Sequence, residues 1–437
     1  MIRRIANAVK WGLAGWTNAG AGRVFRYDPN LDTLRSHLTK RITFAKLDRV
    51  LRGGDDGDIT EALQLFEEIE ASDLRLRNLA NTRRLAVSGL DYEIVGAAEE
   101  REGVDQKLAD DAAAYARETI EGLKGFRKGL KHLPTAIGPN LAVLETVWEY
   151  GRPVEVVPIP TWRLTMNLRE SLDIRVLTTE DRTYGVVADG PKFMVHVPNS
   201  KCGSPLAHGI SRATAWIWLF KKLALSDWGT FCEIFGMPVR VGKYPPNASS
   251  EEKNALKEML QGLGSNAWAM VSSAVTLDLA ESSQRGTSPY EAFMNALNRE
   301  LAIGWLGGNL TSDTTGGTGT YAAAEVQDQV REDLRDDDIK SEEETLDDQF
   351  LAPLVTLKFG PDTPVPHFRR ITPDNVDRVL EGNVMRVAQA AGVQVPRKWA
   401  YERLGIPEPE EGEAVLDPVD AFEAGVTEGG GAGDFGG

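Results

Sequence analysis

The chain has 437 residues, of which 42% are hydrophobic, so it is long enough to form two or three domains with a substantial core. Its 65 acidic residues outnumber its 49 Lys and Arg residues, and the formal net charge is -16. This charge argues against tight wrapping of nucleic acid by the chain as a whole, although it does not exclude a surface along which DNA slides.

Residues 1–29 form the first predicted segment, an amphipathic or disordered arm. The arm is basic and weakly apolar, but Lys10 and Trp11 interrupt the apolar run that an export signal requires. No stretch of the chain approaches the roughly 18 uninterrupted apolar residues of a membrane span, so we predict no membrane partner. Cys202 and Cys232 lie in apolar contexts without a C-x-x-C motif, and we predict reduced thiols in the core.

Residues 30–207 read as a mixed region of helices and strands. Leu63, Phe66 and Ile69 have helical spacing, and Ser72 is placed to cap a following helix that ends at Gly89. The stretch "VLETVWEYGRPVEVVPIP" (143–160) predicts two strands joined by a turn. The stretch "YGVVADGPKFMVHVP" (184–198) predicts a second hairpin that turns at 189–191, with His196 in a structural position.

Four arginines lie on the second of these helices: Arg75, Arg77, Arg83 and Arg84. They are suited to contact phosphates, but such a set is more typical of the solvated or salt-bridged side of an amphipathic helix.

Residues 208–236 predict a long helix with an unusually large apolar surface. Apolar residues recur every three or four positions, at Ile210, Ala213, Ile217, Phe220, Ala224, Trp228, Phe231 and Phe235, and Trp216 and Trp218 flank this stripe. A helix that is apolar on more than one side is typical of an element packed between neighbours, and a central core helix is the alternative.

A small module at 237–286 and a second long helix at 287–306 follow. In the module, a helix with a capping box at Ser249 and Glu252 lies between two predicted strands. The second helix has a cap at Ser288 and proline in its first position, Pro289. Its apolar residues step by four along one face, at Phe293, Leu297, Leu301 and Trp305.

Residues 307–320 form a loop rich in Gly, Thr and Ser, which at first suggests a phosphate-binding loop. No Lys or Arg lies between Ala302 and Val330, and a helical pattern rather than a strand precedes the loop. Both features contradict a nucleotide site, which needs a cation and a preceding strand. We therefore predict a mobile loop of small residues that meets something bulky.

Residues 321–354 predict a long acidic helix. Twelve acids lie between Glu325 and Asp348, and clustered carboxylates can hold two metal ions, but no histidine lies nearby and a solvated helix face explains the run better. The next segment is 355–407. The stretches "FLAPLVTLKFG" (350–360), which begins just before it, and "VPHFRRI" (365–371) predict a strand or closing segment, and a last helical piece follows. Residues 408–437 are acidic and Gly-rich, and we predict a disordered tail.

Two long stretches carry a family resemblance. "LFKKLALSDWGTFCEIFGMPVRVGKYP" (219–245) and "LGGNLTSDTTGGTGTYAAAEVQDQVREDLRDDD" (306–338) resemble the family of Mu-like prophage portal proteins, and "LANTRRLAVSGLDYEIV" (79–95) does so more weakly. The resemblance covers about residues 30–405. It implies an α+β portal fold with a mixed α/β wing (30–207), two stem helices (208–236 and 287–306) and a small α/β clip (237–286). The tunnel loop (307–320), the long helix behind it (321–354) and a C-terminal wing or reduced crown (355–407) complete this fold.

The resemblance also implies a function. Protomers of this family form a dodecameric ring at one vertex of a phage head, through which double-stranded DNA is packaged and ejected. The implied partners are the terminase large subunit, the major capsid protein and head–tail connector proteins, with assembly in the bacterial cytoplasm and residence in the virion. The implied channel loop residues are Asn309, Thr311, Ser312, Thr314, Thr315, Gly316, Gly317, Thr318 and Thr320. The implied subunit-packing residues are Trp216, Ile217, Phe220, Trp228, Phe231, Phe235, Phe293, Leu297, Leu301 and Trp305.

Two alternatives remain from the residues themselves. A scaffolding or adaptor protein of the same head shares the acidity and the helices, but does not need the Gly/Thr loop or the aromatic flanks. A metal-dependent nuclease or an ATPase needs the acidic run or the loop as its site, and the missing lysine opposes the ATPase. We expect no catalytic residue, no metal and no cofactor.

Overall fold

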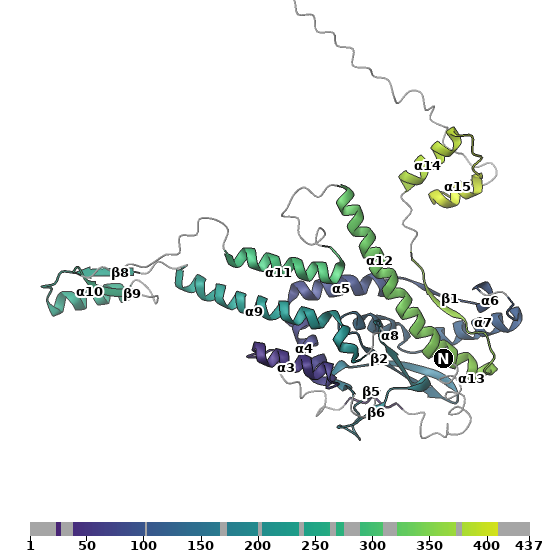
Figure 1. Ribbon diagram of the computed structural model, residues 1–437, viewed down its shortest axis with the longest axis horizontal. Helices are drawn as coiled ribbons and strands as arrows, with labels where there is room; N and C mark the ends of the chain where they lie inside the picture. The colour runs from purple at the N-terminus through teal and green to yellow at the C-terminus, as the bar shows by residue number, and fades with distance from the viewer. Residues whose placement is uncertain are drawn as a thin grey trace, which may run out of the picture. The chain divides into compact units, whose positions relative to one another are not determined.

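The computed structural model describes residues 23–27, 38–100, 103–166, 173–199, 203–235, 240–262, 268–274, 289–308, 321–372 and 378–409. These fall into two compact units, one up to Ile371 and one from Thr372. The first unit contains most of the helices and all of the described strands (Figure 1).

The first helices that the structure describes follow one another along the chain: α3 (Phe44–Asp55), α4 (Ile59–Ser72) and α5 (Leu74–Ser88). The stripe predicted for α4 is buried, and Gly89 ends α5 as expected. The predicted cap is wrong by one residue, because Asp73 rather than Ser72 caps α5. The Oδ1 atom of Asp73 accepts the backbone N–H groups of Arg75 at 2.9 Å and Leu76 at 3.1 Å, whereas the Ser72 hydroxyl donates to the Ile69 carbonyl.

A three-stranded antiparallel sheet lies at the centre of the mixed region. Its order is β3 (Arg152–Ile159), β2 (Ala142–Glu149), β7 (Phe193–His196), and α8 (Phe126–His132) packs against it. The first predicted hairpin is thus confirmed as β2–β3. The helices α6 (Ala97–Glu100) and α7 (Gln106–Gly122) precede α8 along the chain.

The second predicted hairpin is wrong. Its first half, β6 (Val186–Val187), pairs with β5 (Ile174–Val176) in a second sheet that also contains β4 (Leu164–Met166). Its second half is β7, which pairs with β2. The segment Asp189–Pro191 therefore connects two sheets instead of folding one strand back on another.

Segments far apart in sequence close the first unit. The strand β1 (Tyr92–Val95) pairs antiparallel with β10 (His367–Arg370). The helix α12 (Tyr321–Leu346) continues into a π-helical turn (Asp347–Leu351) and then α13 (Ala352–Phe359). Residues 352–359 are thus helical, not the predicted strand, while the strand expected within 365–371 is present as β10. In the π-helical turn, the Gln349 side chain pairs with both the N–H and the carbonyl of Val195 on β7.

The small module consists of β8 (Arg240–Tyr244), α10 (Ser250–Gly262) and β9 (Trp268–Ser272). The two strands pair in parallel, and α10 packs on them. The predicted capping box is confirmed: the Ser249 N–H donates to the Glu252 side chain at 2.8 Å, and the Glu252 N–H donates to the Ser249 Oγ atom at 3.2 Å.

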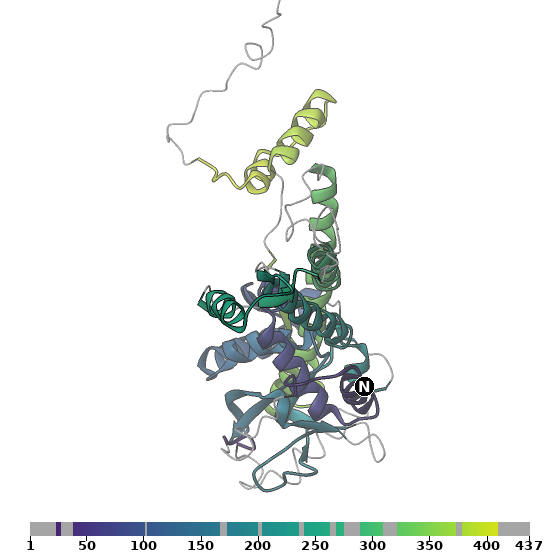
Figure 2. The ribbon, with the colours of Figure 1, turned by 90° about the vertical axis from the view of Figure 1, so that its left-hand side faces the viewer.

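The second unit contains α14 (Arg378–Ala390) and α15 (Arg397–Leu404), which pack against each other (Figures 1 and 2). Of the predicted tail, only Glu408 and Pro409 belong to the described part of the chain, so the prediction of disorder falls outside it.

Candidate functional site

The two longest apolar helices form an antiparallel pair. They are α9 (Ile210–Phe235) and α11 (Pro289–Leu306), and they lie side by side (Figure 1). At one end of the pair the Trp305 indole N–H donates to the Thr214 hydroxyl at 3.1 Å. At the other end Trp228 stacks on Tyr290, with ring centroids 6.4 Å apart and planes inclined by 5°. Both predicted helices are thus confirmed, including Pro289 at the start of α11.

The inner faces of this pair belong to the core of the chain. Trp218 and Leu219 of α9 pack in one cluster with Leu301, Ala302 and Trp305 of α11. The same cluster includes the buried faces of α3, α4 and α5. The α9–α11 pair therefore packs along one face against α3, α4 and α5. Its other faces can contact solvent or a partner.

An ion pair fixes α9 to the start of α5. The Lys221 ammonium lies 2.5 Å from the Oδ2 atom of Asp73, and both side chains are less than a tenth exposed. Because Oδ1 of the same carboxylate caps α5, a single aspartate determines where two helices meet. Removing either partner would leave the other charge buried without compensation.

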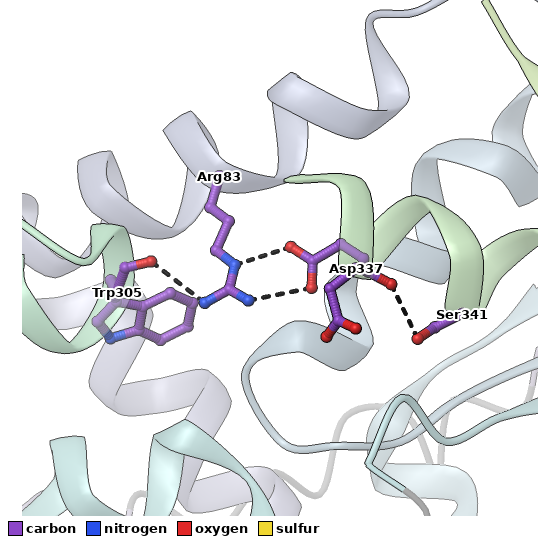
Figure 3. Close-up of polar contacts among 5 residues, drawn as sticks. Arg83, Trp305, Asp337 and Ser341 are labelled. Atoms are coloured by element: carbon purple, nitrogen blue, oxygen red, sulfur yellow. Dashed lines mark hydrogen bonds and ion pairs between the residues drawn. The ribbon is translucent and has the colours of Figure 1, made fainter. Parts of the chain in front are cut away.

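Arg83 joins three elements at the end of α11. From α5 its guanidinium makes two bonds to the Asp338 carboxylate on α12, at 2.8 and 3.0 Å, and a third to the Trp305 carbonyl at 3.3 Å (Figure 3). Burial raises the pKa of Asp338, and the bonds from Arg83 act in the opposite direction. The arginine therefore anchors both sides of the 307–320 segment to α5.

Gly307 makes the close approach of α11 and α12 possible. Its φ of +71° lies in the left-handed region, and its N–H donates to the Ile303 carbonyl at 2.9 Å, which ends the helix. A Cβ atom at this position would lie only 2.5 Å from the Cγ1 atom of Val330. Glycine is thus required both for the turn and for the packing.

Further along α12, acidic side chains bind the rest of the chain. Glu342 makes two bonds of 2.9 Å to Arg370 of β10, and both side chains are almost fully buried. In the π-helical turn, Asp347 accepts the Phe368 N–H at 2.7 Å and lies 2.8 Å from His367. Burial raises the pKa of Glu342 and of Asp347, and their bonding partners oppose the shift.

The expectation of a solvated acidic helix is therefore wrong for part of the run. Within the described ranges, no group of three or more His, Cys, Asp or Glu side chains is placed to hold a metal ion. Two of the acids that a metal site would use, Asp338 and Glu342, are instead paired with arginines.

Comparison with known proteins identifies the family. The family model described as the portal protein of Mu bacteriophage matches residues 63–406. The chain belongs to this family of phage portal proteins.

Two relatives extend over most of the chain. It is 26% identical over 418 residues to the Mu-like prophage FluMu protein gp29 of Haemophilus influenzae, a match that covers 90% of this chain and 79% of the relative. It is 25% identical over 394 residues to the portal protein of Escherichia phage Mu, covering 88% and 75%.

Solved structures of gene transfer agent (GTA) particles are also similar. A chain from the neck of an empty GTA particle matches with a TM-score of 0.46 and 12% identity, covering 78% of this chain and 92% of that one. A chain from the virion of the native particle matches with the same TM-score and identity, covering 83% and 94%.

The predicted subunit-packing residues of this portal-family chain fall into different environments. Leu301 and Trp305 are buried in the chain's own core. Trp216 and Ile217 are half-buried against the same core, and Trp228 and Leu297 are also half-buried. The three phenylalanines Phe220, Phe231 and Phe293 are each more than two-fifths exposed. The side chain of Phe235 lies outside the described residues.

The predicted channel-loop residues, Asn309 to Thr320, also lie outside the described part of the chain, as does Cys202. Cys232 is exposed, so the expectation of a core thiol is wrong for it.

Of the four arginines on α5, Arg83 and Arg84 are salt-bridged, to Asp338 and Glu70, which supports the salt-bridge interpretation for these two. His196 is buried, and its Nδ1 atom lies 2.8 Å from the Thr345 hydroxyl, a structural position as predicted.

Sequence reasoning missed Asp73, Lys221 and Arg370. A helix-capping aspartate before "LRLR" was a usable signal for Asp73. Lys221 and Arg370 gave no such signal. The partner of Lys221, Asp73, is more than a hundred residues away, and the partner of Arg370, Glu342, is 28 residues away. No local pattern specifies how the elements that carry these residues pack.

Among the described helices, none is both long and apolar enough to cross a bilayer.

Proposed function

We propose that this chain is one protomer of a dodecameric portal ring at a single vertex of a phage head, and that DNA enters and leaves the head through the ring. Membership of the portal family supports this proposal most directly. The protomer assembles in the bacterial host cytoplasm and is retained in the virion.

The structural observation that supports the proposal is the exposed aromatic surface of the α9–α11 pair. Phe220, Phe231 and Phe293 each leave more than two-fifths of the side chain in contact with water, and Leu225 does the same. A monomeric protein rarely exposes such a set on one pair of helices. In a closed ring each copy contacts two neighbours, so apolar surface on the stem helices becomes buried at every interface.

In such a ring, each part of the chain has its own role. The stem comprises 208–236 and 287–306, the wing comprises 30–207 together with 321–354 and 355–407, and 237–286 forms the clip. The clip is a compact α/β module between the two stem helices, suited to dock the terminase large subunit and later the head–tail connector proteins. The wing contacts the major capsid protein.

The loop from Asn309 to Thr320 lines the channel. It follows Gly307, which holds the end of α11 close to α12. Because the loop contains no Lys or Arg, it gains nothing from counterion release when a phosphate backbone passes. The excess of acids over bases in the chain keeps DNA from adhering to the wall. The ring guides DNA without making or breaking bonds in it.

Light scattering and negative-stain imaging of the purified full chain test the proposal. We expect rings of about a dozen subunits with a central hole wide enough for a duplex. Phe293→Asp places a charge in the apolar interface and should shift the chain toward monomers, since burying an unpaired carboxylate is costly. The matched control is Tyr150→Asp, at a 95% exposed residue of the β2–β3 turn.

A chain that remains monomeric at high concentration and also in the presence of capsid protein would overturn the ring. Binding to capsid protein without ring formation would instead favour a scaffolding or adaptor role.

A further inference from the structure

The helices α14 and α15 of the second unit carry an apolar surface that their own packing does not cover. Met385 of α14 is buried, whereas Val384 and Val387 of the same helix are 53% and 69% exposed. Trp399 of α15 and Ile406 just after it are 44% and 52% exposed. Two short helices have too little shared core to bury these groups without an additional element.

The same two helices are basic. Between Arg378 and Gly405 the chain has five cations, Arg378, Arg386, Arg397, Lys398 and Arg403, against Glu381 and Glu402. The side chains of Arg386, Arg397 and Lys398 are exposed. In a chain with a net charge of -16 this is a local reversal of sign, so the occupant of this surface should be acidic and apolar.

The segment that follows meets this description. From Pro407 to the end the chain has nine acids and no Lys or Arg. Within it, Val415, Val419, Phe422 and Val426 are spaced by four, three and four, which places them on one face of a helix. Asp417 followed by Pro418 is a typical helix start, with aspartate as the cap and proline in the first position.

We propose that residues 415–426 of the same chain dock on α14 and α15 as an amphipathic helix, with Val419 and Phe422 on the exposed valines and Trp399. The segment is too polar to fold alone, and it gains its helix from the surface that it covers. Five residues separate Pro409 from Val415, and an extended chain of this length reaches about 20 Å, the length of α14. The tail is therefore long enough to fold back on its own helices.

This inference does not depend on the portal function, because it concerns only the second unit and the tail. A docked tail also hides Trp399 and the flanking cations from other proteins.

Hydrogen exchange of the full-length chain, read by mass spectrometry, tests the docking. We compare the wild type with the double variant Val419→Ala/Phe422→Ala, which leaves the sequence of α14 and α15 intact. The expected result is that amides of 378–406 exchange about tenfold faster in the variant. The matched control is Phe435→Ala, which removes the same ring from the same tail outside the apolar stripe and should exchange like the wild type.

A second variant tests the other side of the contact. Val387→Asp puts an acid under the acidic segment and should speed exchange in 415–426, whereas Val326→Asp, at a similarly exposed valine of α12, should not. Raising the salt concentration should also weaken the protection, because it screens the opposite charges.

Equal exchange of 378–406 in all the tail variants would overturn the proposal. Protection that disappears on dilution would do so as well, since it would show that a second copy, not the same chain, covers the surface. Protection by capsid protein alone would assign the surface to that partner.

Discussion

At the scale of single residues, the acidic helix α12 and its π-helical turn attach the chain to itself through specific carboxylates. Asp338 binds Arg83 of α5, Glu342 binds Arg370 of β10, and Asp347 binds the backbone of β10. The bond to Arg83 spans 255 residues of sequence, and those from Arg370 and Phe368 of β10 span 28 and 21. The cost of burying these carboxylates is offset only while their partners are present.

The Glu342–Arg370 pair gives a direct prediction. Arg370→Met leaves Glu342 buried without a cation and should lower the free energy of unfolding by about 3–5 kcal/mol. Arg369→Met, on the exposed side of the same strand, should change it by less than about 1 kcal/mol, the usual contribution of an exposed cation. Urea denaturation monitored by circular dichroism measures both.

The double variant Arg370→Met/Glu342→Leu should recover much of the loss, because no charge then remains buried. The bonds from Arg370 oppose the upward shift in the pKa of Glu342, so that pKa rises further in the single variant Arg370→Met. The variant should therefore lose less unfolding free energy at pH 5, where Glu342 is more readily protonated, than at pH 8. A loss of stability that persists unchanged in the double variant would contradict this account.

His196 gives a pH prediction. Burial lowers its pKa from 6.5 to about 4, so the folded chain keeps it neutral while the unfolded chain protonates it. The stability that it contributes is complete above pH 6.5 and is lost as the pH falls toward 4, by about 3 kcal/mol. The Thr345 hydroxyl donates to the Ser341 carbonyl, so Nδ1 of His196 is the donor in their contact.

His196→Asn keeps a donor near the Nδ1 position and does not titrate. Melting temperatures of the variant should therefore fall less steeply than those of the wild type between pH 6.5 and 4.5, while the difference at pH 8 reports packing alone. Parallel curves across this range would show that His196 is not protonated on unfolding.

At the scale of elements, the sequence predicted the helices much better than the strand pairings. The stripes of α4, α5, α9 and α11 and the capping box of α10 depend on neighbours within one or two turns, which a local pattern contains. The partner of β10 is β1, more than 270 residues away, and the segment at 189–191 joins two sheets although its Asp-Gly-Pro sequence favours a hairpin. Tertiary packing determines these strand pairings, and the local sequence contains no signal for it.

The same limit applies to the candidate site. Periodicity identified the apolar residues of α9 and α11, but it could not tell which of their faces the chain buries in its own core. Leu301 and Trp305 face the core and Phe293 faces outward, although all three share one predicted stripe.

The junction of α11 and α12 can be tested with two glycines. Gly307→Ala forces alanine into the left-handed region and pushes its Cβ atom against Val330, so it should destabilise the chain by roughly 2–4 kcal/mol. Gly304→Ala, one turn earlier, would bring its Cβ atom to 3.9 Å from Ile210, an ordinary contact, and should be neutral or stabilising by up to about 1 kcal/mol. Thermal unfolding of the two variants measures the difference, and equal effects would mean that α12 can move away from α11 at little cost.

At the scale of the whole molecule, two forces oppose each other in the proposed ring. Exposed phenylalanines on α9 and α11 favour association, while a net charge of -16 on every copy disfavours it. Salt separates these contributions, because it screens repulsion between exposed charges and leaves apolar contacts intact or strengthens them.

We therefore expect the fraction of chains in rings to rise as NaCl increases from about 20 mM to about 500 mM, where the screening length falls below roughly 5 Å. Light scattering at fixed protein concentration measures this fraction, and Phe293→Asp should remain dissociated at every salt concentration. If salt instead dissolved the rings, ion pairs between subunits would dominate the interface. The ring would then be held by charged groups of the wing or the clip, and the exposed aromatic residues of α9 and α11 would need a different partner.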